Sequence, residues 1–280
     1  MKKVAAIHDI SGFGKCSLTV ALPIISAIGV EACAMPTAVL STHTGGIEGY
    51  TYRDLTEDMR PFARHWKSLG LHFDAVYTGF LGSFEQLEIV SEFIDDFKTE
   101  DNLIVIDPVM ADNGVLYGVF TPDFVAGMCK LCRKADVLVP NITEASLLVG
   151  EEYREGPYTK KHVEQLLKKL GKLGPSKIVL TGVFFDDVEL GAATYDSRTG
   201  EITYALSRRI PGYYHGTGDV FGSVLVAVLL KGFSLPEAAE IAVYFTTESI
   251  RRTAEAKTDV RFGVNFEESI PGLLKKIGLV

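Results

Sequence analysis

Residues 214–223 contain the side chains of this sequence whose types and spacing are best suited to chemistry. Gly216 and Gly218 precede an almost wholly apolar run that ends at Lys231 and Gly232, a pattern that predicts the entry to a buried helix. The start of a helix offers unpaired backbone N–H groups and a partial positive charge, and glycines let an anion approach the backbone closely. The segment therefore predicts an anion site made by the backbone.

Asp219 is the unusual member of this segment, because a carboxylate beside a bound phosphate would repel it. One interpretation is a helix cap, since acidic residues stabilise the first helical turn. The other is a general base, which accepts the proton of a hydroxyl group as that group attacks a phosphoryl group. The short Gly-x-Gly-Asp pattern alone favours the cap, and only the rest of the chain favours the base.

Two further groups of polar residues come after predicted strands. Asp107 and Asp112 follow the apolar run 103–106, and acids at the end of a buried strand are suited to a divalent metal with substrate phosphates. Asn141 and Glu144 follow the next strand and would share one face of a helix, within reach of the same ion or its waters. An N-terminal cap with Glu in the first turn explains Asn141 and Glu144 equally well.

The first predicted strand, residues 4–7, opens into a glycine-rich turn that contains Asp9 and Ser11. A nucleoside-triphosphate P-loop does not fit this turn, because Asp9 and Cys16 stand where that motif requires other residues. The dinucleotide fingerprint does not fit either, because one of its glycines is missing. The turn nevertheless lies at the end of a strand, where α/β proteins place ligands.

Residues 41–46, with the sequence Ser-Thr-His-Thr-Gly-Gly, follow the second predicted strand. The hydroxyl groups, the imidazole of His43 and the two glycines suit a polar ligand that approaches the backbone. Taken alone, the segment is explained better as an ordinary turn.

The overall charge argues against two classes of partner. A formal net charge of −8 over 280 residues gives no general attraction for nucleic acid or an anionic membrane. The longest apolar stretch, residues 224–230, is too short to span a bilayer, and the apolar N-terminal segment is too short for a signal peptide. We therefore expect a cytoplasmic protein that binds a small molecule and neither nucleic acid nor membrane. The pair Cys129 and Cys132 is expected to be partly buried thiols rather than a metal or redox site.

Apolar strand runs alternate with helical periodicity along the whole sequence, which predicts one α/β domain over residues 1–280 with a mostly parallel sheet and helices on both faces. Within this pattern, residues 30–40 predict a strand broken by Pro36, and residues 54–66 predict a helix. The polar turns follow successive strands, and in a parallel sheet those strand ends share one edge. This convergence favours the catalytic interpretation of Asp219.

Four motifs, in this order along nearly the whole chain, resemble the ribokinase-like superfamily and within it the pyridoxal kinases. They are Ser41-Thr42-His43-Thr44-Gly45, Asp107-Pro108-Val109-Met110, Pro140-Asn141-Ile142-Thr143-Glu144 and Gly216-Thr217-Gly218-Asp219. The resemblance implies a three-layer α/β/α sandwich with a mostly parallel central sheet. It also implies ATP-dependent phosphorylation of the 5′-hydroxymethyl group of pyridoxal, pyridoxine or pyridoxamine, for salvage of pyridoxal 5′-phosphate.

The resemblance also assigns roles to residues of this sequence. Asp219 matches the catalytic base, and the backbone from Gly216 to Gly218 matches the anion hole. The implied nucleotide contacts are Asp107, Asn141, Glu144, Thr181, Gly182, Gly216, Thr217 and Gly218. The implied substrate contacts are Asp9, Ser11, His43, Thr44, Phe80 and Asp219. Glu144, Asp107 and Asp112 match a Mg²⁺ site that acts largely through water or phosphate, and members of the family are often helped by K⁺ and are commonly homodimers.

Asp9 departs from the pyridoxal kinases, which usually have Ser at the end of the first strand. The related hydroxymethylpyrimidine kinases have Asp in that region, although they typically have Cys at the position of Asp219. A hydroxymethylpyrimidine kinase is therefore the alternative within the superfamily, and a non-catalytic vitamer-binding protein is the alternative from another class. The acid at position 9 would pair with a protonated ring nitrogen or an amine, which would favour pyridoxamine as a substrate.

Overall fold

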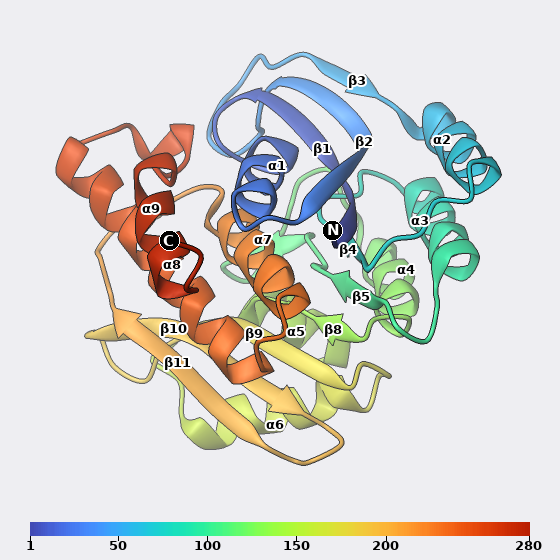
Figure 1. Cartoon of the computed structure of the whole chain (residues 1–280). Coiled ribbons are helices and arrows are strands. Elements are labelled where there is room, and N and C mark those ends of the chain that lie inside the picture. Colours follow the sequence, from blue (N-terminus) through green and yellow to red (C-terminus); the bar gives the residue numbers. More distant parts are fainter.

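A nine-stranded sheet forms the centre of the computed structural model, which describes residues 1–280 (Figure 1). The strand order is β11-β10-β9-β8-β5-β4-β1-β2-β3. The parallel part consists of β1 (Lys3–Phe13), β2 (Glu31–Thr42), β4 (Ala75–Thr78), β5 (Leu103–Ile106), β8 (Val137–Leu138) and β9 (Lys177–Val183). Antiparallel pairing occurs only toward the two edges, at β3 (Tyr52–Asp54), β10 (Glu189–Asp196) and β11 (Ile202–Arg208). The predicted mostly parallel sheet is confirmed.

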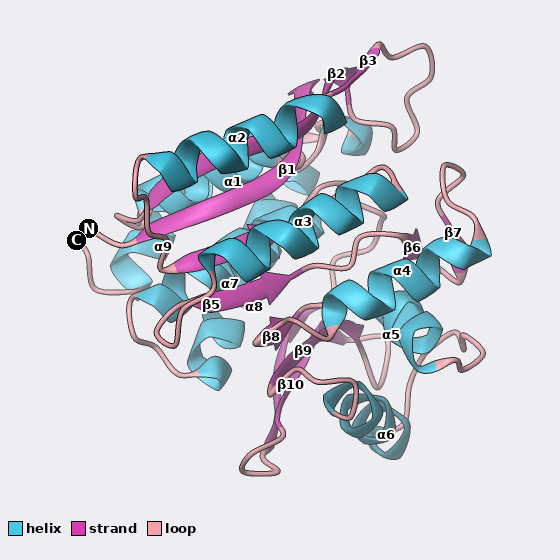
Figure 2. Ribbon diagram, turned by 90° about the vertical axis from the view of Figure 1, so that its right-hand side faces the viewer, coloured by secondary structure: helices cyan, strands magenta, loops and turns pink.

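Helices cover both faces of this sheet (Figure 2). One face carries α1 (Leu18–Ala27), α7 (Thr217–Leu230), α8 (Leu235–Ala256) and α9 (Ile270–Lys276). The other carries α2 (Thr56–Ser68), α3 (Phe84–Phe97), α4 (Pro122–Cys132), α5 (Ile142–Val149) and α6 (Lys160–Gly171). Successive strand residues alternate between the two cores, so that Val4 packs with α7 while Ala5 packs with α3. The predicted three-layer α/β/α sandwich is confirmed.

Two features of the N-terminal strands differ from the sequence-based prediction. β1 continues to Phe13, so Asp9 and Ser11 lie within a strand rather than in a turn. The prediction that Pro36 breaks the second strand is wrong, since β2 runs through it. The pairing register shifts between His8 and Ile10, opposite Pro36 and Val39, so an extra residue of β2 is accommodated there. An irregular pairing tolerates a proline because no ladder hydrogen bond from its nitrogen is required.

Short elements that the sequence pattern did not predict lie near the carboxyl ends of the strands. β3 precedes α2, which begins at Thr56 rather than at residue 54. β6 (Ala111–Asp112) and β7 (Val115–Leu116) form a small separate hairpin after β5. Two single 3₁₀ turns, η1 (Val260–Phe262) and η2 (Glu267–Ser269), follow α8. None of the helices combines the length and apolar character that crossing a bilayer requires.

Candidate active site

The first turn of α7 has no side-chain cap. Its N-cap residue is Gly216, in the left-handed region with φ of 73° and ψ of 1°. A Cβ at this position would lie 2.0 Å from the carbonyl oxygen of Lys15, so only glycine fits. The N–H groups at the start of α7 therefore keep the unpaired, anion-attracting character that the sequence predicted.

Asp219 lies in this uncapped first turn, and its side chain is 16% exposed. Burial raises the pKa of this carboxyl group to about 7; the backbone N–H of Ser17 opposes the rise, and the charge of Asp9 adds to it. Burial also raises the pKa of the Cys16 thiol, with further contributions from Asp219 and Asp9. The structure thus brings together the end of β1, the loop before α1 and the start of α7.

Asp9 is buried, with 5% of its surface exposed, and both carboxylate oxygens accept hydrogen bonds. Ser17 Oγ donates to Oδ1 at 2.6 Å, and Ser11 Oγ donates to Oδ2 at 3.1 Å. Ser17 has a positive φ of 55°, which is unusual for a residue with a side chain and costs backbone strain. Asp9 and Ser11, two of the implied substrate contacts, are thus hydrogen-bonded to each other, while Ser17 was missed because a residue at the end of a loop carries no sequence pattern.

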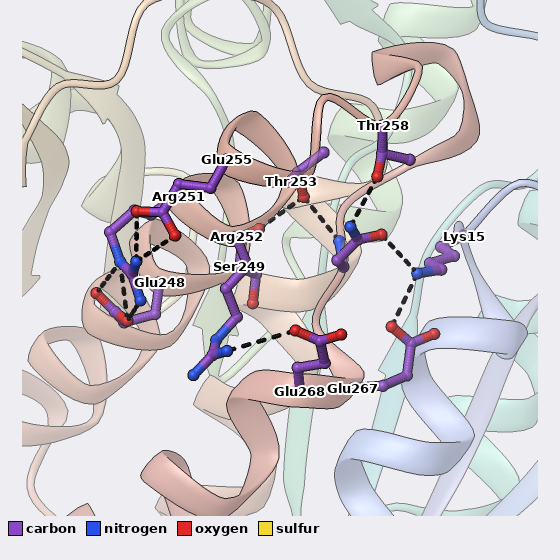
Figure 3. A network of polar contacts seen from close by, with 11 residues as sticks. Lys15, Glu248, Ser249, Arg251, Arg252, Thr253, Glu255, Thr258, Glu267 and Glu268 are labelled. Carbon is purple, nitrogen blue, oxygen red and sulfur yellow. Dashed lines mark hydrogen bonds and ion pairs between the residues drawn. The ribbon is translucent and has the colours of Figure 1, made fainter.

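The loop before α1 is anchored to the C-terminal part of the chain (Figure 3). Lys15 Nζ donates to Asn265 Oδ1 at 3.1 Å and to Glu267 Oε2 at 2.8 Å. The Lys15 N–H donates to the carbonyl oxygen of Phe262 at 3.0 Å. This lysine is therefore committed to structural contacts, which agrees with the poor fit of the turn to a P-loop.

His43 is buried, and its two ring nitrogens have different partners. Nδ1 accepts a hydrogen bond from the N–H of Gly45 at 3.1 Å, so Nε2 carries the proton and donates to the carbonyl oxygen of Arg261. The His43 ring lies 5.1 Å from the ring of His215, at the entry to α7. This contact joins the loop after β2 to the proposed anion site, and sequence reasoning had not identified His215.

Thr44, beside His43, is exposed and faces a hollow of about 610 Å³, which is lined by Thr44, Gly46, Ile47, Glu48 and Arg261. Phe80 is half-buried, and its ring lies 5.6 Å from that of Phe120. The backbone carbonyl of Phe80 accepts a hydrogen bond from Thr37 Oγ1 at 3.2 Å. Phe80 is thus held from two sides, at the end of β4.

Glu144 forms a capping box with Asn141 at the start of α5. Its N–H donates to Asn141 Oδ1 at 2.9 Å, and its Oε2 accepts from the Asn141 N–H at 2.9 Å. The other oxygen, Oε1, accepts from the N–H of Met110 at 3.1 Å, which ties α5 to the segment after β5. Asn141 and Glu144 therefore form the helix cap that was one of their two interpretations, and Glu144 lies buried beside Asp107.

The two buried carboxyl groups have no cationic side chain as a partner. Burial raises the pKa of Glu144 to about 8, and burial together with the charges of Glu144 and Asp219 raises the pKa of Asp107 well above its usual value. No three His, Cys, Asp or Glu side chains are grouped as direct metal ligands. A divalent cation that binds through water and phosphate fits these two acidic groups, since such an ion would stabilise their ionised forms.

Asp112 lies on β6, and Tyr213 binds it to the entry of α7. Tyr213 donates its hydroxyl proton to Asp112 Oδ2 at 2.6 Å, and the charge of Asp112 contributes to the raised pKa of Glu144. Thr181 pairs with Asn141 in an isolated parallel bridge. The predicted nucleotide residues of β5, α5 and β9 thus lie along one edge of the sheet, with Gly182 next to Thr181 at a φ of 75°.

Comparison with known proteins gives matches along most of the chain. Residues 21–263 match the family described as phosphomethylpyrimidine kinase. A crystal structure of a candidate phosphomethylpyrimidine kinase from Bacteroides thetaiotaomicron, in a form with pyridoxal, is 41% identical, with a TM-score of 0.93 over 97% of this chain and 95% of that one. The crystal structure of pyridoxal kinase from Lactobacillus plantarum is 33% identical, with a TM-score of 0.90 over 98% and 97% of the two chains.

Among curated proteins, pyridoxal kinase from Arabidopsis thaliana is 31% identical over 198 residues. That match covers 66% of this chain and 60% of the plant protein, so it spans less than two thirds of that relative's length. These similarities confirm the resemblance to pyridoxal kinases that the four motifs indicated.

Proposed function

Because the chain belongs to the phosphomethylpyrimidine kinase family, we propose that it transfers the γ-phosphoryl group of ATP to the 5′-hydroxymethyl group of a vitamin B6 vitamer. The observation that supports this proposal most strongly is the position of Asp219. It lies in the first turn of a helix that has no side-chain cap, so the capping role considered for it is not realised. Its carboxyl group has a pKa of about 7, which suits a general base near neutral pH.

In this mechanism the hydroxyl group of the substrate donates its proton to the Asp219 carboxylate while its oxygen attacks the γ-phosphorus. The bond to the β-phosphate oxygen breaks, and ADP leaves. The backbone N–H groups of Gly216, Thr217 and Gly218 stabilise the negative charge of the transferring group. The low exposure of Asp219 keeps water away from the base and favours transfer to the substrate over hydrolysis.

The edge of the sheet formed by β5, α5 and β9 would bind the nucleotide. Thr181 and Gly182 would line the nucleotide site, and Asn141 would position the cation through Glu144. Asp107, Glu144 and Asp112 would hold Mg²⁺ through water and phosphate, and the burial of Asp107 and Glu144 without a cationic partner supports this assignment. When bound, Mg²⁺ would neutralise phosphate charge that would otherwise repel Asp219.

The vitamer would lie between the end of β1 and the loop after β2. Asp9 and Ser11 would contact its ring nitrogen or amine, His43 and Thr44 would contact it from the facing loop, and Phe80 would pack against its ring. The fixed tautomer of His43 supports this role, because its ring is already held by Gly45 and Arg261. Stimulation by K⁺ and a homodimer are included in the proposal on the resemblance alone. A single domain over residues 1–280 and a cytoplasmic location are included on the sequence pattern and composition.

A hydroxymethylpyrimidine kinase is the second candidate, favoured by the match to the phosphomethylpyrimidine kinase family and by Asp9. The deciding experiment is an ADP-release assay with Mg-ATP and, in turn, pyridoxal, pyridoxine, pyridoxamine, hydroxymethylpyrimidine and ribose. We expect the largest kcat/KM with a B6 vitamer. A preference for hydroxymethylpyrimidine would establish the alternative, and vitamer binding without ADP release would indicate a non-catalytic binding protein.

A further inference from the structure

His8 is a fully buried histidine directly below the proposed active site, and the mechanism above gives it no role. It lies on β1, has 0% of its surface exposed, and neither ring nitrogen has a hydrogen-bond partner. Leaving a buried donor or acceptor unsatisfied destabilises the folded state. A buried polar group in this condition requires an explanation, because most buried polar atoms in proteins are paired.

Its neighbours fix the ring in place. The edge of the Tyr77 ring packs against it, with 4.4 Å between centroids and an interplanar angle of 70°. On another side the ring fills the space above Gly79, where a Cβ would lie 2.1 Å from His8 Nδ1. Gly79, directly after β4, and Tyr77, on β4 itself, therefore hold the imidazole with little freedom to turn.

The fixed ring places Nδ1 close to the proposed base. His8 Nδ1 lies 4.0 Å from Asp219 Oδ1. Burial lowers the pKa of His8 to about 3, although the backbone of Tyr77 opposes the shift, so the ring is neutral near neutral pH and carries one proton. A lone pair on Nδ1 would face the carboxylate unfavourably, and a proton on Nδ1 would face it favourably, so the Nδ1–H tautomer is expected.

We propose that His8 is a positioning residue whose Nδ1–H hydrogen-bonds the Asp219 carboxylate and holds it in line with the attacking hydroxyl group. This inference rests on the proposed role of Asp219 as the base. The distance of 4.0 Å between Nδ1 and Oδ1 is longer than a hydrogen bond of about 2.7–3.2 Å, so the bond forms when the Asp219 side chain moves toward His8. The ring of His8 stays where Tyr77 and Gly79 hold it.

Two substitutions separate hydrogen bonding from packing. His8→Phe keeps an aromatic ring against Tyr77 but has no donor, whereas His8→Asn keeps an N–H near the Nδ1 position but loses the ring. We expect His8→Phe to lower kcat by about ten- to a hundredfold with little change in KM, and His8→Asn to retain more of kcat. A larger loss in His8→Asn than in His8→Phe would overturn the proposal in favour of packing.

A double-mutant cycle with Asp219→Asn tests whether His8 acts through Asp219. In the Asp219→Asn background, adding His8→Phe should lower the residual rate by less than twofold, because the carboxylate that His8 positions is gone. A structural role would lower the rate equally in both backgrounds, and that result would contradict the proposal. Thermal denaturation of each variant checks that the chain is folded.

A second measurement does not depend on activity. In protein with ¹⁵N-labelled imidazoles, the His8 signal is identified by its loss in His8→Phe. We expect the proton on Nδ1 and a shift of its resonance in Asp219→Asn. A proton on Nε2, or an unshifted resonance in Asp219→Asn, would overturn the inference about His8. A lack of phosphorylation of all the tested substrates would instead contradict only the proposed function, so the two failures can be told apart.

Discussion

Gly216 faces the carbonyl oxygen of Lys15 so closely that a methyl group on its α-carbon would lie 2.0 Å from that oxygen. This contact joins the N-terminus of α7 to the loop that follows β1. Since Gly216 also has a positive φ of 73°, a side chain is excluded there by two independent effects. The entry to α7 is therefore fixed against the loop that follows β1, and Asp219 lies in the first helical turn of α7.

Gly216→Ala should destabilise the fold by about 2 kcal/mol or more, because it adds both the clash and the unfavourable φ. Gly218→Ala is the matched control for stability. Gly218 lies inside the first turn of α7, a Cβ there would meet nothing within 4 Å, and its φ is not positive. Chemical denaturation should give an unchanged or higher free energy of unfolding for Gly218→Ala. Equal destabilisation by both substitutions would contradict this view of the turn.

The raised pKa of Asp219 predicts how turnover depends on pH. The carboxyl group is protonated below about pH 7 and ionised above it, and only the ionised form accepts a proton. The value of kcat/KM should therefore fall as the pH drops through about 7, approaching tenfold for each unit below it.

Asp9→Asn provides the comparison for this pH profile. The charge of Asp9 contributes to the raised pKa of Asp219, so removing that charge should move the acid limb to lower pH. The measurement is kcat/KM against pH for both proteins. An acid limb that moves upward, or a flat profile between pH 5 and pH 8 in the parent, would exclude Asp219 as the titrating base.

Glu144→Gln tests the Mg²⁺ assignment. The substitution should raise the Mg²⁺ concentration needed for half-maximal turnover by about tenfold, because a negative charge beside the cation is lost. It should also lower the free energy of unfolding by about 1–3 kcal/mol. The Glu144 carboxylate accepts hydrogen bonds from the N–H groups of Met110 and Asn141, and in the glutamine variant one of these N–H groups would face an amide NH₂ instead of an oxygen.

Glu237→Gln is the control, because Glu237 forms the equivalent capping box with Ser234 at the start of α8 and is exposed. Its Mg²⁺ titration should match that of the parent. If Glu144→Gln titrated with Mg²⁺ as Glu237→Gln does, the Glu144 carboxylate would be a helix cap alone.

The sequence predicted the mostly parallel sheet and the helix layers on both of its faces, because those depend on local patterns of apolar residues. Ser83, for example, stands directly before an amphipathic run and caps α3 by accepting a hydrogen bond from the N–H of Gln86. The route of β2 through Pro36 was not predictable, since the register shift that accommodates the proline depends on the neighbouring strand. In the same way, nothing local to the sequence pairs Asp9 with Ser17.

The candidate site could be predicted only in part. The motifs identified Asp219 and Glu144, but the pattern around Asn141 was compatible with a cap and with a cation site, and the structure shows the cap directly. His8 and His215 were missed because their roles depend on distances to other elements, 4.0 Å to Asp219 and 5.1 Å to His43. A single histidine in a strand has no spacing that reveals such a contact.

The central claim is that Asp219 is the general base, and the turnover of Asp219→Asn tests it most directly. Asparagine keeps the shape of the side chain but cannot accept the proton, so we expect kcat to fall by at least about a hundredfold. ATP binding should persist or tighten, because a negative charge near the phosphates is removed. Lost turnover with retained binding of ATP and vitamer is the predicted result. Near-normal turnover in a folded Asp219→Asn protein would contradict the assignment.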